Sequence, residues 1–347
     1  MSRAGRALLT RRQLGAALAG LGMPAAAAAA KAPPAKPAPA AKSPGAANPP
    51  PAAARPAPAP NPVAGGNPVR VGSKPDTEGM LLGNVILKVL EHAEVPVENR
   101  LGIGPTRIVR AALLAGAIDL YPEYTGNGAF FFHRETDPAW RDQAAGYALV
   151  KQLDEQQNGL LWLPAAPADN AWAIAVRADV AAGNRLQTMS DFARWVNGGA
   201  PVKLAASAEF VESPAALPAF QTTYGFKLNS DQILMLVGGN TAATIRAAAE
   251  NLSGVNAAMA YGTDGALSVL RLAVMQDDKH AQIFFAPAPV VRQSVAQAYP
   301  LIASSLAPVF AALDAATLRR LNAQIAVDGD DPAMTATGWL ESTGLLG

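Results

Sequence analysis

Residues 119–128 of the sequence are Asp-Leu-Tyr-Pro-Glu-Tyr-Thr-Gly-Asn-Gly. The stretch Ile118–Tyr121 predicts a strand that ends at Pro122, and the glycines after it predict a tight turn that opens a helix. Ligands of open α/β sheets bind beyond the carboxyl ends of strands. Tyr124, which follows the strand, is therefore a candidate for ligand contact, whereas Tyr121 is expected to belong to the core.

The same alternation of strand and helix extends on both sides of this stretch. Further strands are expected at Val69–Ser73, Leu101–Ile103, Leu160–Leu163, Trp172–Val176, Val202–Ala206, Ala257–Tyr261 and Ile283–Phe285. Helices are expected from Thr77 to Leu90, over Thr106–Ala115 and over Trp140–Leu153. Such a sequence predicts an α/β fold in which helices cover both faces of parallel or mixed sheets. The 279 residues from Val69 onward are long for one sheet, so two lobes are expected.

The first 68 residues have a different composition. Residues 1–30 hold a basic segment with the pair Arg11-Arg12, a ten-residue apolar stretch and a run of alanines, which predicts a cleaved signal peptide of the twin-arginine type. An ordinary secretory signal with an incidental arginine pair is the alternative. Residues 31–68 are rich in Pro and Ala and can bury little apolar surface, so a disordered linker is expected there.

Composition and charge exclude several classes of function. Residues 1–68 hold eight of the 28 Lys and Arg and none of the 27 Asp and Glu, so residues 69–347 carry a net charge of −7. An acidic surface argues against a nucleic-acid partner. The absence of cysteine excludes disulfides and thiolate metal sites, and three scattered histidines argue against a metal centre. Neither a phosphate-binding loop nor a nucleophile elbow is present, so we expect no catalytic residues and no cofactor.

Five motifs follow one another over about 220 residues in the order of a known family. They are Val71-Gly72-Ser73-Lys74 with Thr77-Glu78-Gly79, Tyr-Pro-Glu-Tyr-Thr-Gly at 121–126, Asn170-Ala171-Trp172-Ala173, Ala260-Tyr261-Gly262-Thr263-Asp264-Gly265, and Ala286-Pro-Ala-Pro-Val-Val-Arg292. With them the chain resembles the periplasmic substrate-binding proteins of quaternary-amine (glycine betaine and choline) osmoprotectant ABC transporters, in particular the OsmF-like members. The resemblance runs from Val69 nearly to the C-terminus.

The resemblance implies a cage of aromatic rings around a trimethylammonium group. Its members would be Tyr124, Trp172, Tyr261 and Phe285. A quaternary ammonium cannot donate a hydrogen bond, so a protein recognises it by shape, dispersion and the negative faces of rings. The alternative is that a ring on a strand belongs to the core, and Phe284 could face the ligand in place of Phe285.

For the carboxylate of glycine betaine, the resemblance implies Lys74 as the cation, with a solvated surface lysine as the alternative. Thr106 is a second candidate, equally well explained as a helix cap. Asn127 and Asn170 complete the predicted ligand-binding residues, where relatives have Thr or Asp. Ser213 stands where the family carries an arginine, so the carboxylate contacts are expected to be weaker and the ligand could be choline.

These observations predict a two-lobed periplasmic-binding-protein fold of type II with the ligand in the interlobe cleft. Lobe one would comprise 69–171 plus 287–347, and lobe two 172–286. The expected function is to bind a small quaternary-ammonium osmoprotectant in the periplasm and deliver it, as a monomer, to an inner-membrane ABC permease. The alternatives are a ligand-sensing periplasmic receptor and an exported enzyme on the same fold.

Overall fold

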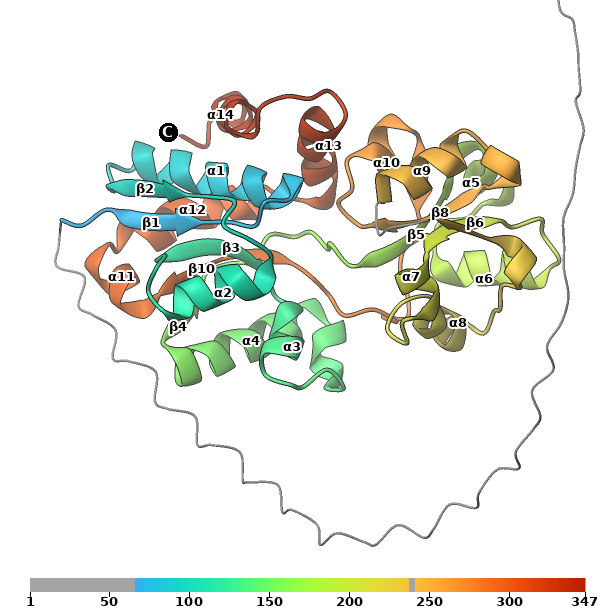
Figure 1. Cartoon of the computed structure of the whole chain (residues 1–347), viewed down its shortest axis with the longest axis horizontal. Coiled ribbons are helices and arrows are strands. Elements are labelled where there is room, and N and C mark those ends of the chain that lie inside the picture. The colour runs from blue at the N-terminus through green and yellow to red at the C-terminus, as the bar shows by residue number, and fades with distance from the viewer. Residues whose placement is uncertain (1–65, 237–240, 347) are drawn as a thin grey trace, which may run out of the picture. The chain divides into compact units, whose positions relative to one another are not determined.

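Two five-stranded mixed sheets form the framework of the computed structural model, which describes residues 66–236 and 241–346 (Figure 1). The first sheet has the spatial order β2 (Val97–Arg100), β1 (Val69–Gly72), β3 (Leu120–Tyr124), β10 (Pro287–Arg292) and β4 (Leu160–Trp162). The second has the order β7 (Ile233–Leu236), β6 (Leu204–Ser207), β8 (Ala257–Tyr261), β5 (Trp172–Arg177) and β9 (Leu272–Val274).

The two sheets have the same pattern of strand directions. In the first sheet β1 runs parallel to β2 and β3, while β10 runs antiparallel to β3 and β4. In the second sheet β6 runs parallel to β7 and β8, while β5 runs antiparallel to β8 and β9. A parallel pair requires a crossover connection, and helices supply it in both sheets.

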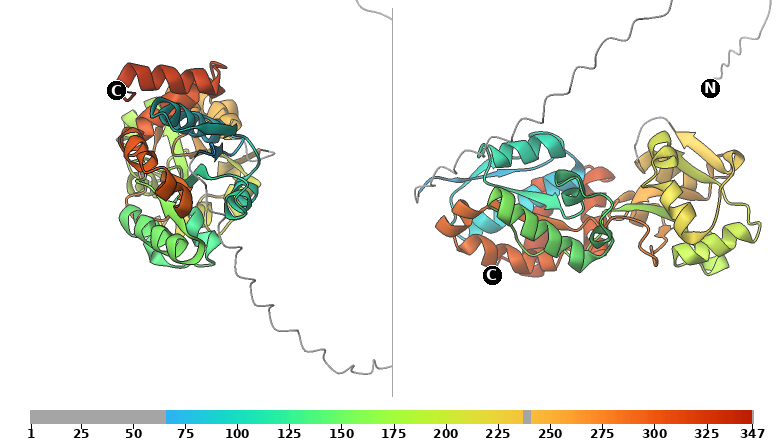
Figure 2. Two further views of the ribbon diagram at one scale, coloured as in Figure 1. Left: turned by 90° about the vertical axis from the view of Figure 1, so that its left-hand side faces the viewer. Right: turned by 90° about the horizontal axis from the view of Figure 1, so that it is seen from below.

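Helices cover both faces of each sheet, as Figures 1 and 2 show from three directions. The helices of the first sheet are α1 (Thr77–His92), α2 (Thr106–Leu114), α3 (Asn127–Phe131), α4 (Gln143–Asn158), α11 (Gln293–Ala298), α12 (Leu301–Ala311), α13 (Ala315–Ala326) and α14 (Pro332–Thr343). Those of the second are α5 (Ala178–Asn184), α6 (Met189–Asn197), α7 (Ala208–Glu212), α8 (Leu217–Tyr224), α9 (Thr241–Ala249) and α10 (Ala266–Val269). Short 3-10 turns lie at Pro138–Arg141, Ser230–Gln232 and Leu252–Gly254.

Each sheet separates two apolar cores. In the first sheet Val71 packs among α1, α12 and α14, whereas Tyr121 of the neighbouring strand packs with Trp140 and Trp162 on the opposite face. In the second sheet Ile174 and Val176 face one core and Ala175 faces the other, as the two-residue period of a strand requires. Tyr121 is fully buried, which confirms its predicted place in the core.

Helix α1 carries the most informative turn of the fold. Asp76 caps its N-terminus by accepting a hydrogen bond from the backbone N–H of Gly79 at 2.9 Å, and Glu78 lies in the first turn. A β-carbon on Gly79 would lie 2.8 Å from the carbonyl oxygen of Lys74, so the turn between β1 and α1 leaves no room for a side chain at position 79. The turn thereby brings Lys74, Asp76 and Glu78 to one edge of the first sheet.

Three element predictions are wrong. Leu101–Ile103 is not a strand: residues 101 and 102 form a turn, and the strand lies just before them as β2, which is at the sheet edge and has only one apolar residue, Val97. Ile283–Phe285 is not a strand, and β10 begins two residues later. Its residues Pro287 and Pro289 are untypical of a strand, so the sequence did not indicate one there. The helix expected from Trp140 starts at Gln143, because Asp142 caps it.

Strand β3 continues past Pro122 to Tyr124, contrary to the predicted end. Proline is tolerated there because β1 pairs with β3 only at Val71 and Leu120, so no ladder hydrogen bond to the Pro122 nitrogen is required on that side. On the other side Pro122 lies opposite Pro289.

The predicted signal peptide, 1–30, and the predicted linker up to residue 65 lie outside the described residues. The last three linker residues are described, and the Tyr299 hydroxyl contacts two of them: it accepts from the Gly66 N–H at 3.3 Å and donates to the Asn67 carbonyl at 2.7 Å. Within the part of the chain that the structure describes, no single helix has the length and apolar character to cross a membrane; α12 and α13, bent by 91°, meet that criterion only when taken together.

Candidate functional site

All eight residues predicted to bind a ligand line one cavity of about 720 Å³ to which both sheets contribute. They are Lys74, Thr106, Tyr124, Asn127, Asn170, Trp172, Tyr261 and Phe285. Strand direction explains why they meet. Lys74 and Tyr124 stand at the carboxyl ends of β1 and β3, and Phe285 precedes the antiparallel strand β10 at the same edge.

The second sheet contributes a stacked aromatic pair. Trp172 opens β5 and lies directly opposite Tyr261, the last residue of the antiparallel strand β8. Their ring centroids are 4.3 Å apart and their planes differ by 24°, so each ring covers one face of the other. Buried Phe210 packs edge-on against Trp172 at 5.4 Å. The pair is therefore a rigid platform that can offer a ligand only its uncovered faces.

Both cavity tyrosines are protonated at neutral pH. Burial raises the pKa of Tyr261 to about 12, with the charges of Glu209 and Asp264 adding to the effect. Burial and the neighbouring Glu78 raise the pKa of Tyr124 well above its ordinary value. The rings therefore act as neutral π-systems with a polar tip.

Lys74 is buried, so its interpretation as a solvated surface residue is wrong. Its Nζ lies 3.0 Å from a carboxylate oxygen of fully buried Glu123 and 4.2 Å from the centroid of the Tyr124 ring. The same Glu123 carboxylate accepts hydrogen bonds from the Asn127 side chain at 2.7 Å and from the Tyr121 hydroxyl at 2.9 Å. The positive charge of Lys74 is thus already compensated from within the protein.

Glu78, which is not among the predicted ligand-binding residues, also lines the cavity and is 5% exposed. One carboxylate oxygen accepts the Tyr124 hydroxyl at 2.6 Å and lies 3.4 Å from the Asn170 amide nitrogen; the other accepts the Asn322 amide at 2.6 Å. Burial raises the pKa of Glu78, the nearby charge of Asp76 raises it further, and these hydrogen bonds oppose the shift.

Asn322 of α13 was also missed. Its amide nitrogen donates both to Glu78 and to the carbonyl oxygen of Thr263 at 2.9 Å, and Arg319 one turn earlier donates to the carbonyl oxygen of Gly262 at 2.7 Å. A β-carbon on Gly265 would lie 2.3 Å from a backbone nitrogen of α13. No pattern in the sequence links this C-terminal helix with the loop after β8, more than 50 residues away.

The cavity lining is acidic. Asp76, Glu78, Glu209 and Asp264 contribute carboxylates, while Lys74 is the one basic residue among the described lining residues. Burial raises the pKa of Asp264, whose carboxylate accepts the backbone N–H of Tyr261 at 2.7 Å. Such a surface favours a cation over an anion.

The remaining candidates differ in outcome. Ser213, at the position of the family's arginine, lines the cavity as the C-cap of α7. The cap interpretation of Thr106 is wrong because Pro105 is the capping residue of α2. Phe285 lines the cavity, and Phe284 is not among its lining residues. Phe130 of α3 also lines it.

The two segments that pass between the sheets are joined by Asp169. Its carboxylate accepts the backbone N–H of Phe285 at 2.8 Å and that of Ala171 at 3.0 Å, and the Asn170 N–H donates to the Phe285 carbonyl at 3.0 Å. Burial raises the pKa of Asp169 to about 6. The backbone that carries Asn170, Trp172 and Phe285 into the cavity is therefore fixed by this carboxylate.

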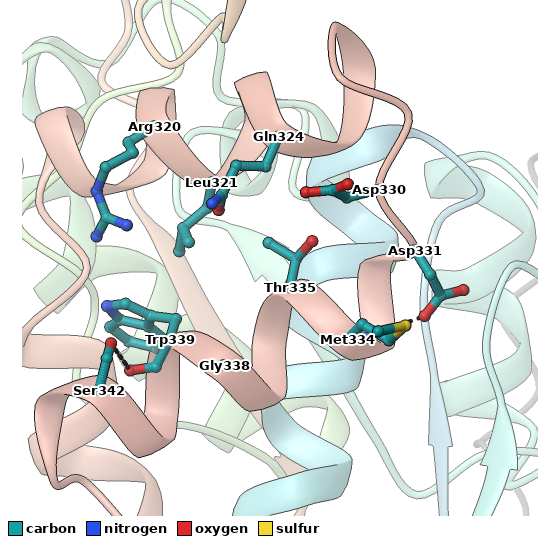
Figure 3. A pocket seen from close by; sticks show the side chains of 10 residues that line it. All are labelled: Arg320, Leu321, Gln324, Asp330, Asp331, Met334, Thr335, Gly338, Trp339 and Ser342. Atoms are coloured by element: carbon teal, nitrogen blue, oxygen red, sulfur yellow. Dashed lines mark hydrogen bonds between the residues drawn. The ribbon is translucent and has the colours of Figure 1, made fainter.

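A second cavity of about 420 Å³ lies between α13 and α14 (Figure 3). Figure 3 shows Arg320 and Gln324 on one helix facing Thr335 and Trp339 on the other. The Thr335 hydroxyl is buried without a hydrogen-bond partner in the described part of the chain. None of the predicted ligand-binding residues lines this cavity.

Comparison with known proteins gives consistent matches. Residues 67–342 match the substrate-binding domain of ABC-type glycine betaine transport systems. The glycine betaine-binding protein YehZ of Escherichia coli is 55% identical over 275 residues, which cover 79% of this chain and 90% of that protein. A glycine-betaine-binding protein of Pseudomonas aeruginosa is 31% identical, over 80% of this chain and 88% of its own. The apo structure of YehZ superposes with a TM-score of 0.77 over 80% of this chain and 99% of that one, which confirms the predicted two-lobed fold.

Proposed function

This chain belongs to the family of substrate-binding domains of ABC-type glycine betaine transport systems, and on that basis we propose that it binds a small quaternary-ammonium osmoprotectant and delivers it to an ABC permease. Its ligand would be glycine betaine or a choline-like cation. The ligand is released unchanged, so the protein is not an enzyme. We place it outside the cytoplasmic membrane, exported by the predicted signal peptide at 1–30, and acting as a monomer.

One observation carries this proposal: aromatic rings from both sheets line a single acidic cavity. Tyr124 comes from the first sheet, Trp172 and Tyr261 from the second, and Phe285 from the segment between them. A trimethylammonium group is bulky, apolar on its surface and positively charged, and each ring within about 6 Å of it contributes on the order of 0.5–2 kcal/mol. Because the rings come from both lobes, a bound cation would draw the lobes together.

The cavity is poorer in groups for a carboxylate. Lys74 is already paired with Glu123, and Ser213 offers no charge. The Asn127 amide, which could have donated to a carboxylate, donates to Glu123 instead. We therefore propose that affinity resides in the ammonium end of the ligand, and that choline and glycine betaine bind with similar strength.

Calorimetric titration of the mature protein tests the proposal. Glycine betaine and choline should bind with measurable heat, and proline, which lacks a quaternary nitrogen with three methyl groups, should bind more weakly than either. Lobe closure should accompany binding as a decrease in the radius of gyration measured by X-ray scattering. The proposal fails if no quaternary amine binds while the protein is folded.

A further inference from the structure

The buried carboxylates of the protein separate into two kinds. Four are buried among the described residues, namely Glu78, Asp119, Glu123 and Asp154. Asp119 is ion-paired with Arg70 at 2.8 Å and with Arg292 at 3.2 Å, Glu123 with Lys74 at 3.0 Å, and Asp154 with Arg110. Within the described ranges Glu78 has no ion pair, and it is the one of the four that lines the ligand cavity.

An unpaired buried carboxylate is costly. Removing a charged group from water costs several kcal/mol unless an opposite charge compensates it, so natural proteins pair buried acids with a cation or let them take up a proton. Tyr124, Asn170 and Asn322 are neutral donors: they orient the Glu78 carboxylate without cancelling its charge. The missing partner is a cation, and the cavity beside Glu78 is the space in which one could arrive.

The position of Glu78 fits that task. Its carboxylate is hydrogen-bonded to the hydroxyl of Tyr124, a predicted wall of the cage. Asn170 stands two residues before Trp172, and Asn322 ties the carboxylate to the carbonyl of Thr263, two residues after Tyr261. The carboxylate thus lies at the meeting point of the segments that carry the cage rings.

We propose that Glu78 supplies the counter-charge for the ligand's quaternary ammonium, and that Tyr124, Asn170 and Asn322 hold its carboxylate in place for this role. This inference rests on the proposed function. The aromatic rings would select the shape of the ligand, and Glu78 would select its positive charge. In the free protein burial favours the protonated form of Glu78 and the donated hydrogen bonds oppose it, whereas a bound cation favours the ionised carboxylate.

A pH dependence follows from this arrangement. The ionisable side chains that line the cavity together with Glu78 are Lys74, Asp76, Tyr124, Glu209, Tyr261 and Asp264, and Arg319 lies one turn before Asn322 on α13. Because burial raises the pKa of Glu78, lowering the pH protonates it sooner than an exposed glutamate. Affinity for a cation should then decrease as the pH falls through that pKa, and a proton should be released on binding at the lower pH values.

The test compares choline with its neutral carbon isostere, in which a tert-butyl group replaces the trimethylammonium. Shape and hydroxyl are the same, so the ratio of the two affinities reports the charge alone. In Glu78→Gln the choline affinity should decrease about tenfold or more, which corresponds to about 1.4 kcal/mol, while the affinity for the isostere should stay within about twofold. Glu78→Asp, which retains the charge, should keep most of the preference, and Glu155→Gln on the exposed face of α4 should leave both affinities unchanged.

The outcomes separate a failure of the proposed function from a failure of the proposed role of Glu78. If wild-type protein binds no quaternary amine, the proposed function fails. If wild-type protein binds choline and Glu78→Gln loses both ligands equally, Glu78 is only structural and the inference fails alone. Should Glu78→Gln not fold, titrations of wild-type protein between pH 4 and 8 decide. If the choline affinity decreases as the pH is lowered while the affinity for the isostere stays constant, the inference is supported. If both affinities change with pH in the same way, the inference is overturned.

Discussion

Two buried carboxylates near the ligand cavity, Glu123 behind its lining residues Lys74 and Asn127 and Glu78 in the lining itself, differ in the partners that the protein provides. Glu123 is fully buried, pairs with Lys74, and has further hydrogen bonds from Tyr121 and Asn127. Glu78 is as well supplied with hydrogen bonds, yet its donors are neutral. Hydrogen bonding alone therefore does not distinguish Glu78 from Glu123; the ion pair of Glu123 with Lys74 does.

The largest expected effect is on the free energy of unfolding, which should differ between variants of Glu123 and Glu78. Glu123→Ala leaves Lys74 buried without its partner, so the free energy of unfolding should decrease by about 3–5 kcal/mol. Glu78→Gln removes an uncompensated buried charge and should change that free energy by less than about 1 kcal/mol or increase it. Urea denaturation of both variants without ligand measures the contrast. Equal destabilisation by the two substitutions would show that Glu78 has the same structural role as Glu123.

The second-largest effect is expected when a positively charged side chain is introduced into the cavity, because it should change the preference between glycine betaine and choline. Ser213→Arg would restore the charge that the family carries there, and a charge-assisted contact to a carboxylate is worth on the order of 1.5–3 kcal/mol. The gain should appear for glycine betaine and not for choline, so the ratio of the two affinities is the quantity to measure. Glu209 and Glu212 are possible competitors for the new guanidinium, so Ser213→Arg should also be made with Glu212→Gln. An unchanged ratio in both variants would show that residue 213 does not reach the ligand.

Substitution of Trp172 should change ligand affinity through the aromatic ring alone, independently of Glu78 and Glu123. Trp172→Ala should weaken binding of choline by about 1–3 kcal/mol, and Trp172→Phe by less, because a phenyl ring has a weaker quadrupole. Unlike Glu78→Gln, Trp172→Ala should also weaken binding of the neutral isostere, since it removes contact area. If neither substitution changed affinity, Trp172 would only support Tyr261 and Phe210.

The positions of these rings could be predicted from sequence, because strand ends and motifs are local signals. Tyr124, Trp172 and Tyr261 each stand at the end of a strand whose apolar run is visible in the sequence. Strand β10 could not be recognised because its prolines contradict strand propensity. The strand was therefore predicted a few residues too early, at the apolar run Ile283–Phe285.

The roles of Glu78 and Asn322 needed the folded chain. A glutamate in the first turn of a helix is commonly explained by the helix dipole, so Glu78 carried no separate signal. Asn322 is 244 residues from Glu78, and their hydrogen bond exists only because α13 packs beside α1 and the loop after β8. The ion pair of Lys74 with Glu123, which changes the expected role of the lysine, is equally non-local.

The smallest predicted effect concerns Asp169, which like Glu78 has no ion pair within the described ranges. Its folded-state pKa of about 6 lies above the ordinary 3.8, so the folded protein holds this proton more tightly than the unfolded chain. The contribution of this group to the free energy of unfolding is therefore fully present below pH 3.8 and is lost as the pH rises through about 6. Asp169→Asn retains an acceptor for the N–H groups of Phe285 and Ala171 and should flatten that part of the stability profile. An identical profile in wild type and variant would place the proton elsewhere.

The most direct test of the whole account is a crystal structure of the mature protein with choline bound. We expect the trimethylammonium group in the cavity between the sheets, with its nitrogen within about 6 Å of the ring centroids of Tyr124 and of Trp172 or Tyr261. The Glu78 carboxylate should be the nearest negative charge, and Lys74 should remain paired with Glu123. An ammonium group bound away from these rings, or a Glu78 turned away from it, would contradict the account.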